Sequence, residues 1–124
     1  MIFPGSKLNV ADNSGAKKVK CIQVLERTGR TYAKIGSKIV ISILDIVNSA
    51  DKKVTVGTVY HAIVVRTKKG KFRSDGSFIK FSDNSVVIIE KDGNIIGTRV
   101  FGVIPMELKK LGYKKIISLS QEIC

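Results

Sequence analysis

The stretch AIVVRTKKGKFRSDGSFIKF, residues 62–81, predicts two strands joined by a basic loop. Its β-branched beginning and its alternating end are both typical of strands. A turn signal at Asp75-Gly76 lies between them. The cationic residues at its centre are Arg66, Lys68, Lys69, Lys71 and Arg73. Two strands that present such a loop are suited to binding phosphate groups.

The rest of the chain is also patterned with a period of two, which predicts mostly strands. The expected strands are residues 8–10, 18–25, 37–47, 58–66, 78–81, 85–90 and 95–103. The alternation slips at Cys21-Ile22, where we expect a bulge. One helix is predicted over residues 105–112, because Pro105 suits a first turn and Gly112 a helix end. Residues 114–120 are ambiguous.

Many short strands with Gly-rich turns favour an all-β fold, either a sandwich or a small closed barrel. At 124 residues, a barrel of about five or six strands is the better prediction. The chain has no internal repeat and no break in composition, so we expect a single domain over residues 1–124.

The charge balance predicts a polyanionic partner. Twenty-two Lys and Arg against ten Asp and Glu give a net charge of +12, and such an excess is usually kept for a polyanion. The sequence has neither an apolar span of about 18 residues nor a basic amphipathic helix, so nucleic acid is favoured over a membrane. Aromatic residues are only 6% of the chain and Trp is absent, which favours folded RNA over stacked single strands.

The aromatic and basic residues narrow the candidate RNA contacts. Phe72 is the one aromatic residue inside the basic loop, and of Phe78 and Phe81 at least one should lie in the core. Besides the loop, cations cluster after the Asn13-Ser14-Gly15 turn, in the 26–30 connection and in the predicted helix. The candidate RNA-binding residues are Lys17, Lys18, Lys20, Arg27, Arg30, Arg66, Lys68, Lys69, Lys71, Arg73, Lys109 and Lys110.

The sequence offers little for catalysis. His61 is the only histidine and sits in an apolar run, where a packing role is favoured over that of a general base. The aspartates neighbour Asn, Gly or Ser, as turn-forming aspartates do, and no metal-ligand spacing or nucleotide-binding Gly-rich loop is present. Two alternatives stay open: a free single-strand-binding barrel that uses Phe72, and an enzyme that uses His61.

Cysteine usage and composition suggest a compartment. Cys21 and Cys124 are too few and too scattered for a disulfide framework, so we expect a reducing compartment, and no signal peptide is predicted. The chain contains 17 Lys against 5 Arg, and 17 Ile. Both skews are typical of an AT-rich coding sequence, which hints at an organellar or AT-rich bacterial gene.

Several motifs resemble those of a known family. Residues 8–16, LNVADNSGA, resemble the opening motif of the universal large-subunit ribosomal protein L fourteen family. The stretch that begins at Ala62 resembles this family's signature through its aliphatics, basic stretch, Asp75-Gly76, Phe81, Asn84 and Val87-Ile88. Residues 97–102, GTRVFG, and 115–119, KIISL, are similar to its C-terminal motifs. The resemblance covers essentially the whole chain in order.

The resemblance implies a five-stranded barrel with a projecting hairpin and one or two short C-terminal helices. It implies a structural, non-enzymatic role in the large ribosomal subunit, with binding to large-subunit rRNA near the subunit interface. Further implied partners are small-subunit rRNA and the neighbouring ribosomal proteins L three and L nineteen. A docking face for a ribosome-silencing factor would involve Thr98, Arg99 and Lys115. No cofactor, metal, membrane or small-molecule substrate is expected.

The chain departs from bacterial members of this family in three loops. These are Glu26-Arg27-Thr28-Gly29-Arg30, Asn48-Ser49-Ala50-Asp51 and Gly102-Val103. Together with the Ile and Lys skew, the departures favour an organelle-encoded copy, mitochondrial rather than plastid or bacterial.

Overall fold

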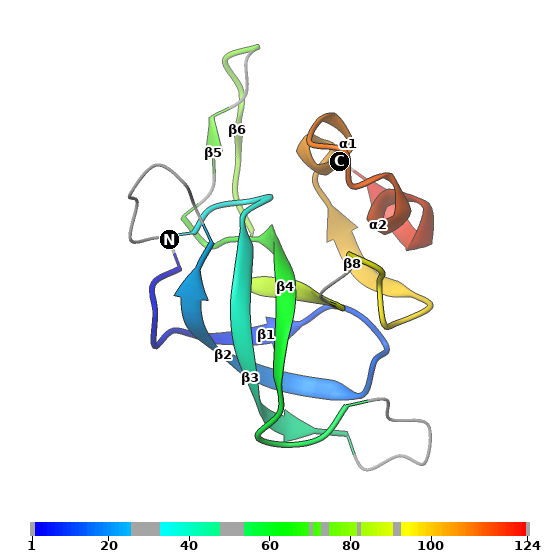
Figure 1. Ribbon diagram of the computed structural model, residues 1–124. Coiled ribbons are helices and arrows are strands. Elements are labelled where there is room, and N and C mark those ends of the chain that lie inside the picture. Colours follow the sequence, from blue (N-terminus) through cyan, green and yellow to red (C-terminus); the bar gives the residue numbers. More distant parts are fainter. Residues whose placement is uncertain are drawn as a thin grey trace.

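A closed five-stranded barrel forms the centre of the computed structural model (Figure 1). The structure describes residues 2–25, 33–47, 54–69, 71–72, 75–81, 83–90 and 93–123. The barrel strands, in spatial order, are β1 (Lys7–Val10), β2 (Ala16–Val24), β3 (Lys38–Ile46), β4 (Val59–Arg66) and β7 (Ser85–Ile89). Neighbouring strands are antiparallel, except that β1 and β7 run parallel and close the barrel. The predicted fold class is confirmed.

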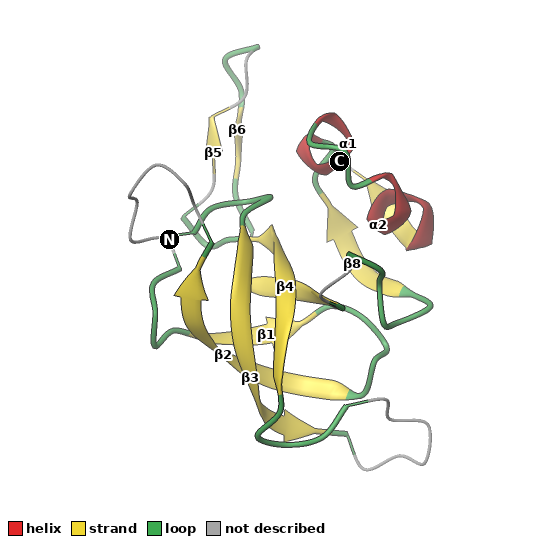
Figure 2. Cartoon of the chain, viewed as in Figure 1, coloured by secondary structure: helices red, strands yellow, loops and turns green. Residues whose placement is uncertain are grey.

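Two smaller units lie outside the barrel (Figure 2). A short hairpin of β5 (Lys71–Phe72) and β6 (Phe78–Ile79) projects away from it. The C-terminal part contains β8 (Val100–Ile104), α1 (Glu107–Lys110), α2 (Lys114–Leu119) and β9 (Ser120–Ile123). β8 and β9 pair in parallel as a separate two-stranded sheet. The projecting hairpin and the two short C-terminal helices are therefore confirmed.

The boundaries differ from prediction in the C-terminal part. The helix expected over residues 105–112 is the short α1; of the ambiguous residues 114–120, residues 114–119 form α2 and Ser120 begins β9. The strand expected to begin at residue 95 begins only at Val100, while Ile95 makes an isolated bridge to Ile89. Gly97 permits the close approach of this segment to Asn13, because a Cβ built there would lie 2.7 Å from Asn13 Oδ1. The segment between Ile95 and Val100 is thus a turn that packs against Asp12 and Asn13, in the connection between β1 and β2.

The bulge predicted at Cys21-Ile22 is confirmed. The ladder between β2 and β3 shifts register between Cys21 and Gln23, and again on either side of Lys18. Cys21 is fully buried while Ile22 is 45% exposed. The extra residue therefore lets β2 bend around the barrel and still direct Cys21 into the core.

β4 and β7 are buried on both faces. Alternate residues, such as Val64 and Ile88, belong to the cluster inside the barrel, together with side chains from β1, β2 and β3. The residues between them, such as Ile63 and Val87, belong to a second cluster with Ile104, Leu108 and Ile116 of the C-terminal part. Burial on both sides explains why these two strands are almost wholly apolar. Phe78 is exposed, whereas Phe81 is partly buried and packs against the second cluster, so one of the pair contacts the core as expected.

Candidate nucleic-acid interface

The outer face of β1 and β2 is basic. Leu8, Val19 and Cys21 point into the barrel and are buried, so their neighbours Lys7, Lys18 and Lys20 point out and are exposed. The register places Lys7 opposite Lys20 and Asn9 opposite Lys18. Lys17 is exposed as well, beside the register shift at Lys18. Three of these lysines were predicted as RNA contacts, but Lys7 was not.

Like charges directly opposite each other on a sheet destabilise it. The Lys7–Lys20 pair is such an arrangement, because the register places the two residues directly opposite each other on the barrel wall. A polyanion placed against this face would remove the repulsion. The barrel wall is therefore suited to phosphate groups.

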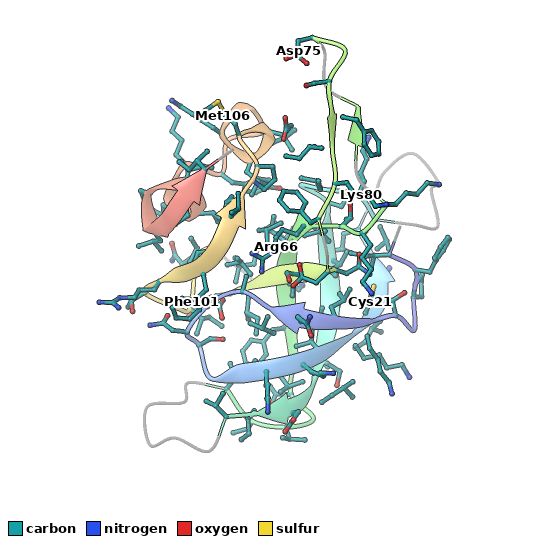
Figure 3. The ribbon with its side chains drawn as sticks, turned by 180° about the vertical axis from the view of Figure 1, so that it is seen from behind. Cys21, Arg66, Asp75, Lys80, Phe101 and Met106 are labelled. Atoms are coloured by element: carbon teal, nitrogen blue, oxygen red, sulfur yellow. The ribbon has the colours of Figure 1, made fainter. Side chains whose placement is uncertain are left out.

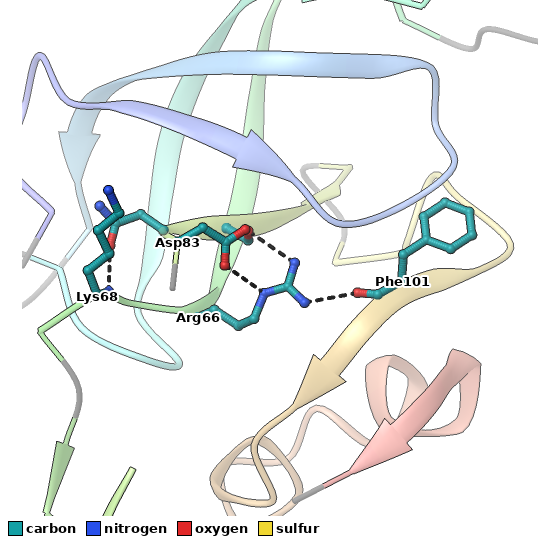
Figure 4. Close-up of polar contacts among 6 residues, drawn as sticks. Arg66, Lys68, Asp83 and Phe101 are labelled. Carbon is teal, nitrogen blue, oxygen red and sulfur yellow. Dashed lines mark hydrogen bonds and ion pairs between the residues drawn. The ribbon is translucent and has the colours of Figure 1, made fainter. Parts of the chain in front are cut away.

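Arg66, at the start of the predicted basic loop, is bound by partners within the chain (Figure 4). Its Nε lies 3.3 Å from Asp83 Oδ1, and its two terminal nitrogens donate to Ser85 Oγ at 3.1 Å and to the Phe101 carbonyl at 3.2 Å. The side chain is only 13% exposed. The Nε–H is not aligned for a hydrogen bond to Asp83, so this contact is an ion pair. Arg66 thus joins the ends of β4 and β7 to β8.

The loop beyond Arg66 exposes its lysines. Lys68 and Lys69 are exposed, and the Lys68 backbone N–H donates to Asn84 Oδ1 at 2.8 Å. At the far end of the hairpin, Asp75 Oδ1 accepts from the backbone N–H and the hydroxyl of Ser77. Figure 3 shows Asp75 at the hairpin tip, away from the barrel. The hairpin is therefore a projecting arm with cations near its base.

Of the remaining predicted contacts, three lie within the described residues and three lie outside them. Lys109 on α1 is exposed. Lys71 lies in β5 and Lys110 in α1. Arg27, Arg30 and Arg73 lie outside the described residues.

The segment that carries Thr98 and Arg99 is held by Asn13. Asn13 Oδ1 accepts from the backbone N–H groups of Thr98 at 2.7 Å and Arg99 at 3.0 Å, and Asn13 Nδ2 donates to Thr98 Oγ1 at 2.8 Å. The Asn13 N–H also donates to the Arg99 carbonyl at 3.3 Å. Both Thr98 and Arg99 are exposed. The predicted partner residues therefore lie on a turn that one side chain organises.

The neighbouring Asp12 anchors the same turn to the barrel. Its Oδ1 accepts from the N–H and hydroxyl of Ser14, and its Oδ2 accepts from the Ile88 N–H at 2.9 Å. Asp12 is buried. The turn role predicted for this aspartate is confirmed, and its bond to Ile88 of β7 is a long-range contact that the local sequence does not reveal.

Lys115, the third predicted partner residue, lies on α2 and is exposed. It lines a pocket of about 310 Å³ together with Lys38 and Lys114. The other lining side chains include Ile63, Ile89, Ile95, Tyr113 and Ile116. An apolar floor beside several lysines is suited to a protein surface with apolar and acidic groups.

The described residues contain no group of three His, Cys, Asp or Glu that could hold a metal ion. His61 is half-buried on β4, and its Nδ1 has no hydrogen-bond partner in the described part of the chain. Burial raises the pKa of the Cys21 thiol, against a smaller lowering by a backbone hydrogen bond at Gln23, so this thiol is a packing group rather than a nucleophile. Among the described residues, no helix is long and apolar enough to cross a membrane.

A rigid barrel with a basic outer wall and a projecting arm defines a nucleic-acid-binding scaffold protein. Comparison with known proteins gives the family. The family model described as "Ribosomal protein L14p/L23e" matches residues 1–124. The chain is also similar to "Large ribosomal subunit protein uL14c" of Cuscuta gronovii, with 46% identity over 123 residues that cover 99% of each chain.

The chain belongs to the ribosomal protein L14p/L23e family. The resemblance inferred from the sequence motifs is thereby confirmed. As a family member, the protein is a structural constituent of the large ribosomal subunit, and its partners are rRNA and other ribosomal proteins.

The Arg66 contact can be tested at Gly102. A Cβ at Gly102 would lie 1.9 Å from an Arg66 terminal nitrogen, whereas a Cβ at Gly57 would meet nothing, and both glycines have a positive φ (80° and 83°). Gly57→Ala should lower the free energy of unfolding by about 1–2 kcal/mol through backbone strain alone. Gly102→Ala should lower it by about 1–3 kcal/mol more. The measurement is denaturant unfolding of both variants in wild-type and Arg66→Ala backgrounds. The extra loss of Gly102→Ala over Gly57→Ala should disappear when Arg66 is absent. A difference that persists without Arg66 would contradict the assigned contact.

The Asn13 contacts predict a local change. Asn13→Ala leaves the Thr98 and Arg99 N–H groups without their acceptor, and should lower the free energy of unfolding by about 1–2 kcal/mol. Asn13→Asp keeps the acceptor and should lower it less. Amide hydrogen exchange should be faster at Thr98 and Arg99 in the Ala variant and close to wild type in the Asp variant. Equal protection in both variants would show that another group holds this turn.

Proposed function

We propose that the protein is a non-enzymatic scaffold whose barrel wall and basic loop neutralise phosphates of large-subunit rRNA, so that rRNA segments pack closely around it. The observation that carries this proposal is the exposed lysine face of β1 and β2, where Lys7 stands opposite Lys20. Such a face is unfavourable in the free protein and favourable against a polyanion. We further propose that residues 1–124 act as one domain, because β4 and β7 contribute to both apolar clusters.

The proposed contacts follow the predicted set. Exposure on the barrel wall supports Lys17, Lys18 and Lys20, and exposure after β4 supports Lys68 and Lys69. Arg66 would act by holding the base of the loop, because its guanidinium already has partners. The rest of the proposed set is Arg27, Arg30, Lys71, Arg73, Lys109 and Lys110.

We propose that Thr98, Arg99 and Lys115 face protein partners. The exposed turn held by Asn13 and the lysine-rimmed apolar pocket beside Lys115 support this role. The family resemblance suggests the partners: ribosomal proteins L three and L nineteen, and a silencing factor where one exists. It also suggests a position near the subunit interface, with bridges to small-subunit rRNA.

We propose that the ribosome is organellar, and mitochondrial in particular. The excess of Lys over Arg and the abundance of Ile support an AT-rich gene, which favours an organellar copy.

A salt-wash experiment tests the proposed function. Large subunits from purified mitochondria, from plastids where present and from the cytosol are centrifuged after a high-salt wash, and the protein is measured by mass spectrometry. The protein should remain with the mitochondrial large subunit in about equimolar amount to its rRNA, because rRNA segments packed closely around the barrel hold it even where salt weakens the individual phosphate contacts. Recovery only in the free fraction would contradict the ribosomal role. Recovery with plastid or cytosolic subunits would contradict only the proposed mitochondrial location, and the ribosomal role would stand.

The basic loop predicts a change in salt dependence. Replacing Lys68, Lys69 and Lys71 by Ala should reduce the slope of log affinity against log salt, for binding to protein-free large-subunit rRNA, by about 0.7–0.9 for each phosphate group that the loop no longer neutralises. The measurement is filter binding over a series of salt concentrations. An unchanged slope would remove this loop from the contact set.

A further inference from the structure

A polar pocket of about 310 Å³ lies where β1, the loop after β4 and the segment before β7 meet. Lys7, Asn9, Lys68, Asp83 and Asn84 line it. The backbone beneath it is fixed, because Asn9 N–H donates to the Asn84 carbonyl at 3.0 Å in the parallel contact that closes the barrel. The pocket is thus formed by rigid elements at the barrel seam.

The pocket presents hydrogen-bond donors that lack acceptors. Asn84 Oδ1 accepts from the Lys68 backbone N–H at 2.8 Å. A backbone N–H can only donate, so the oxygen must face it and the Asn84 NH₂ group must point elsewhere. Within the described part of the chain, neither that NH₂ group nor the ammonium groups of Lys7 and Lys68 have a hydrogen-bond or ion-pair partner.

The pocket carries a net positive charge. Among the described residues that line it, the one acid is Asp83, whose Oδ1 lies 3.3 Å from Arg66 Nε and whose Oδ2 accepts from the Ser85 hydroxyl at 2.7 Å. Both carboxylate oxygens are therefore occupied, and the charge of Asp83 is balanced by Arg66. No acid among the described residues compensates the charges of Lys7 and Lys68, and a third lysine, Lys20, lies directly opposite Lys7 on β2.

We propose that this pocket binds a backbone phosphate of RNA, held by the Lys7 and Lys68 ammonium groups and the Asn84 NH₂ group. The inference rests on the proposed function and specifies one of its contact points. Two ammonium groups and a carboxamide donor match the acceptor oxygens of a phosphodiester. The neighbouring Lys20 and Lys18 continue the positive surface along β2, which favours an extended polyanion over a free phosphate ion.

Binding to protein-free large-subunit rRNA tests the site in the full-length protein. Lys7→Gln and Lys68→Gln should each weaken binding about tenfold and reduce the salt slope by about 0.7–0.9. The double variant should lose less than the product of the two single effects, because both lysines hold the same phosphate. Lys34→Gln is the matched control: it removes an exposed lysine that does not line the pocket, and should change the affinity less than twofold.

The Asn84 side-chain NH₂ resonance gives a local measurement that does not depend on overall affinity. It should shift when rRNA is added to the wild-type protein, and Lys7→Gln should need about tenfold more rRNA for the same shift. Inorganic phosphate should produce the shift only at far higher concentration. A shift with inorganic phosphate but none with rRNA would overturn the RNA assignment.

The outcomes separate the two proposals. If wild-type protein binds rRNA, and Lys7→Gln binds with the same affinity, salt slope and Asn84 shift, the pocket is not a phosphate site and the ribosomal role stands. If wild-type protein neither binds rRNA nor cosediments with large subunits, both proposals fail. Each variant's unfolding transition is compared with wild type, so that weakened binding is attributed to the site only in a folded protein.

Discussion

The arrangement of the molecule depends on the burial of β4 and β7 from both sides. A barrel strand with a solvated exterior alternates apolar and polar residues, because only one face enters the core. Here the outward residues Ile63, Val65 and Val87 are covered by the C-terminal part and are fully or almost fully buried. Burial of each such side chain contributes about 1.5–3 kcal/mol. The apolar contact therefore holds the C-terminal part to the barrel.

Polar contacts then set the orientation of the C-terminal part on the barrel. Arg66 bonds to the Phe101 carbonyl from one side, and Asn13 bonds to the segment at Thr98 and Arg99 from another. A single hydrogen bond contributes only about 1 kcal/mol net, which is less than one buried aliphatic side chain. These hydrogen bonds matter more for orientation than for stability, because they fix which side chains of the turn face solvent. The exposed partner face is thus a consequence of internal polar bonds.

The sequence predicts those parts of the fold that depend on neighbouring residues. The period of two indicated the barrel strands, and the slip at Cys21-Ile22 indicated the bulge, because both signals are local. The role of Arg66 could not be read in this way: it stands beside loop lysines in the chain, but its partner Phe101 is 35 positions away. Asn13 is similar, since a turn-forming role is visible locally while its bonds to residues 98 and 99 are not. Lys7 is isolated in the sequence and joins a cluster only through its register with Lys20.

Rigidity explains how the lysine face can serve binding despite its cost. Opposed lysines destabilise a sheet by about 0.2–1 kcal/mol, which a well-packed barrel core can absorb. Because the barrel holds the backbone of these lysines in place, little backbone freedom is left to lose when a polyanion binds. Neutralising these charges removes a repulsion from the folded protein, so a bound polyanion also stabilises the fold. Assembly and folding are therefore linked through the same lysines: the face that weakens the free protein strengthens the assembled one.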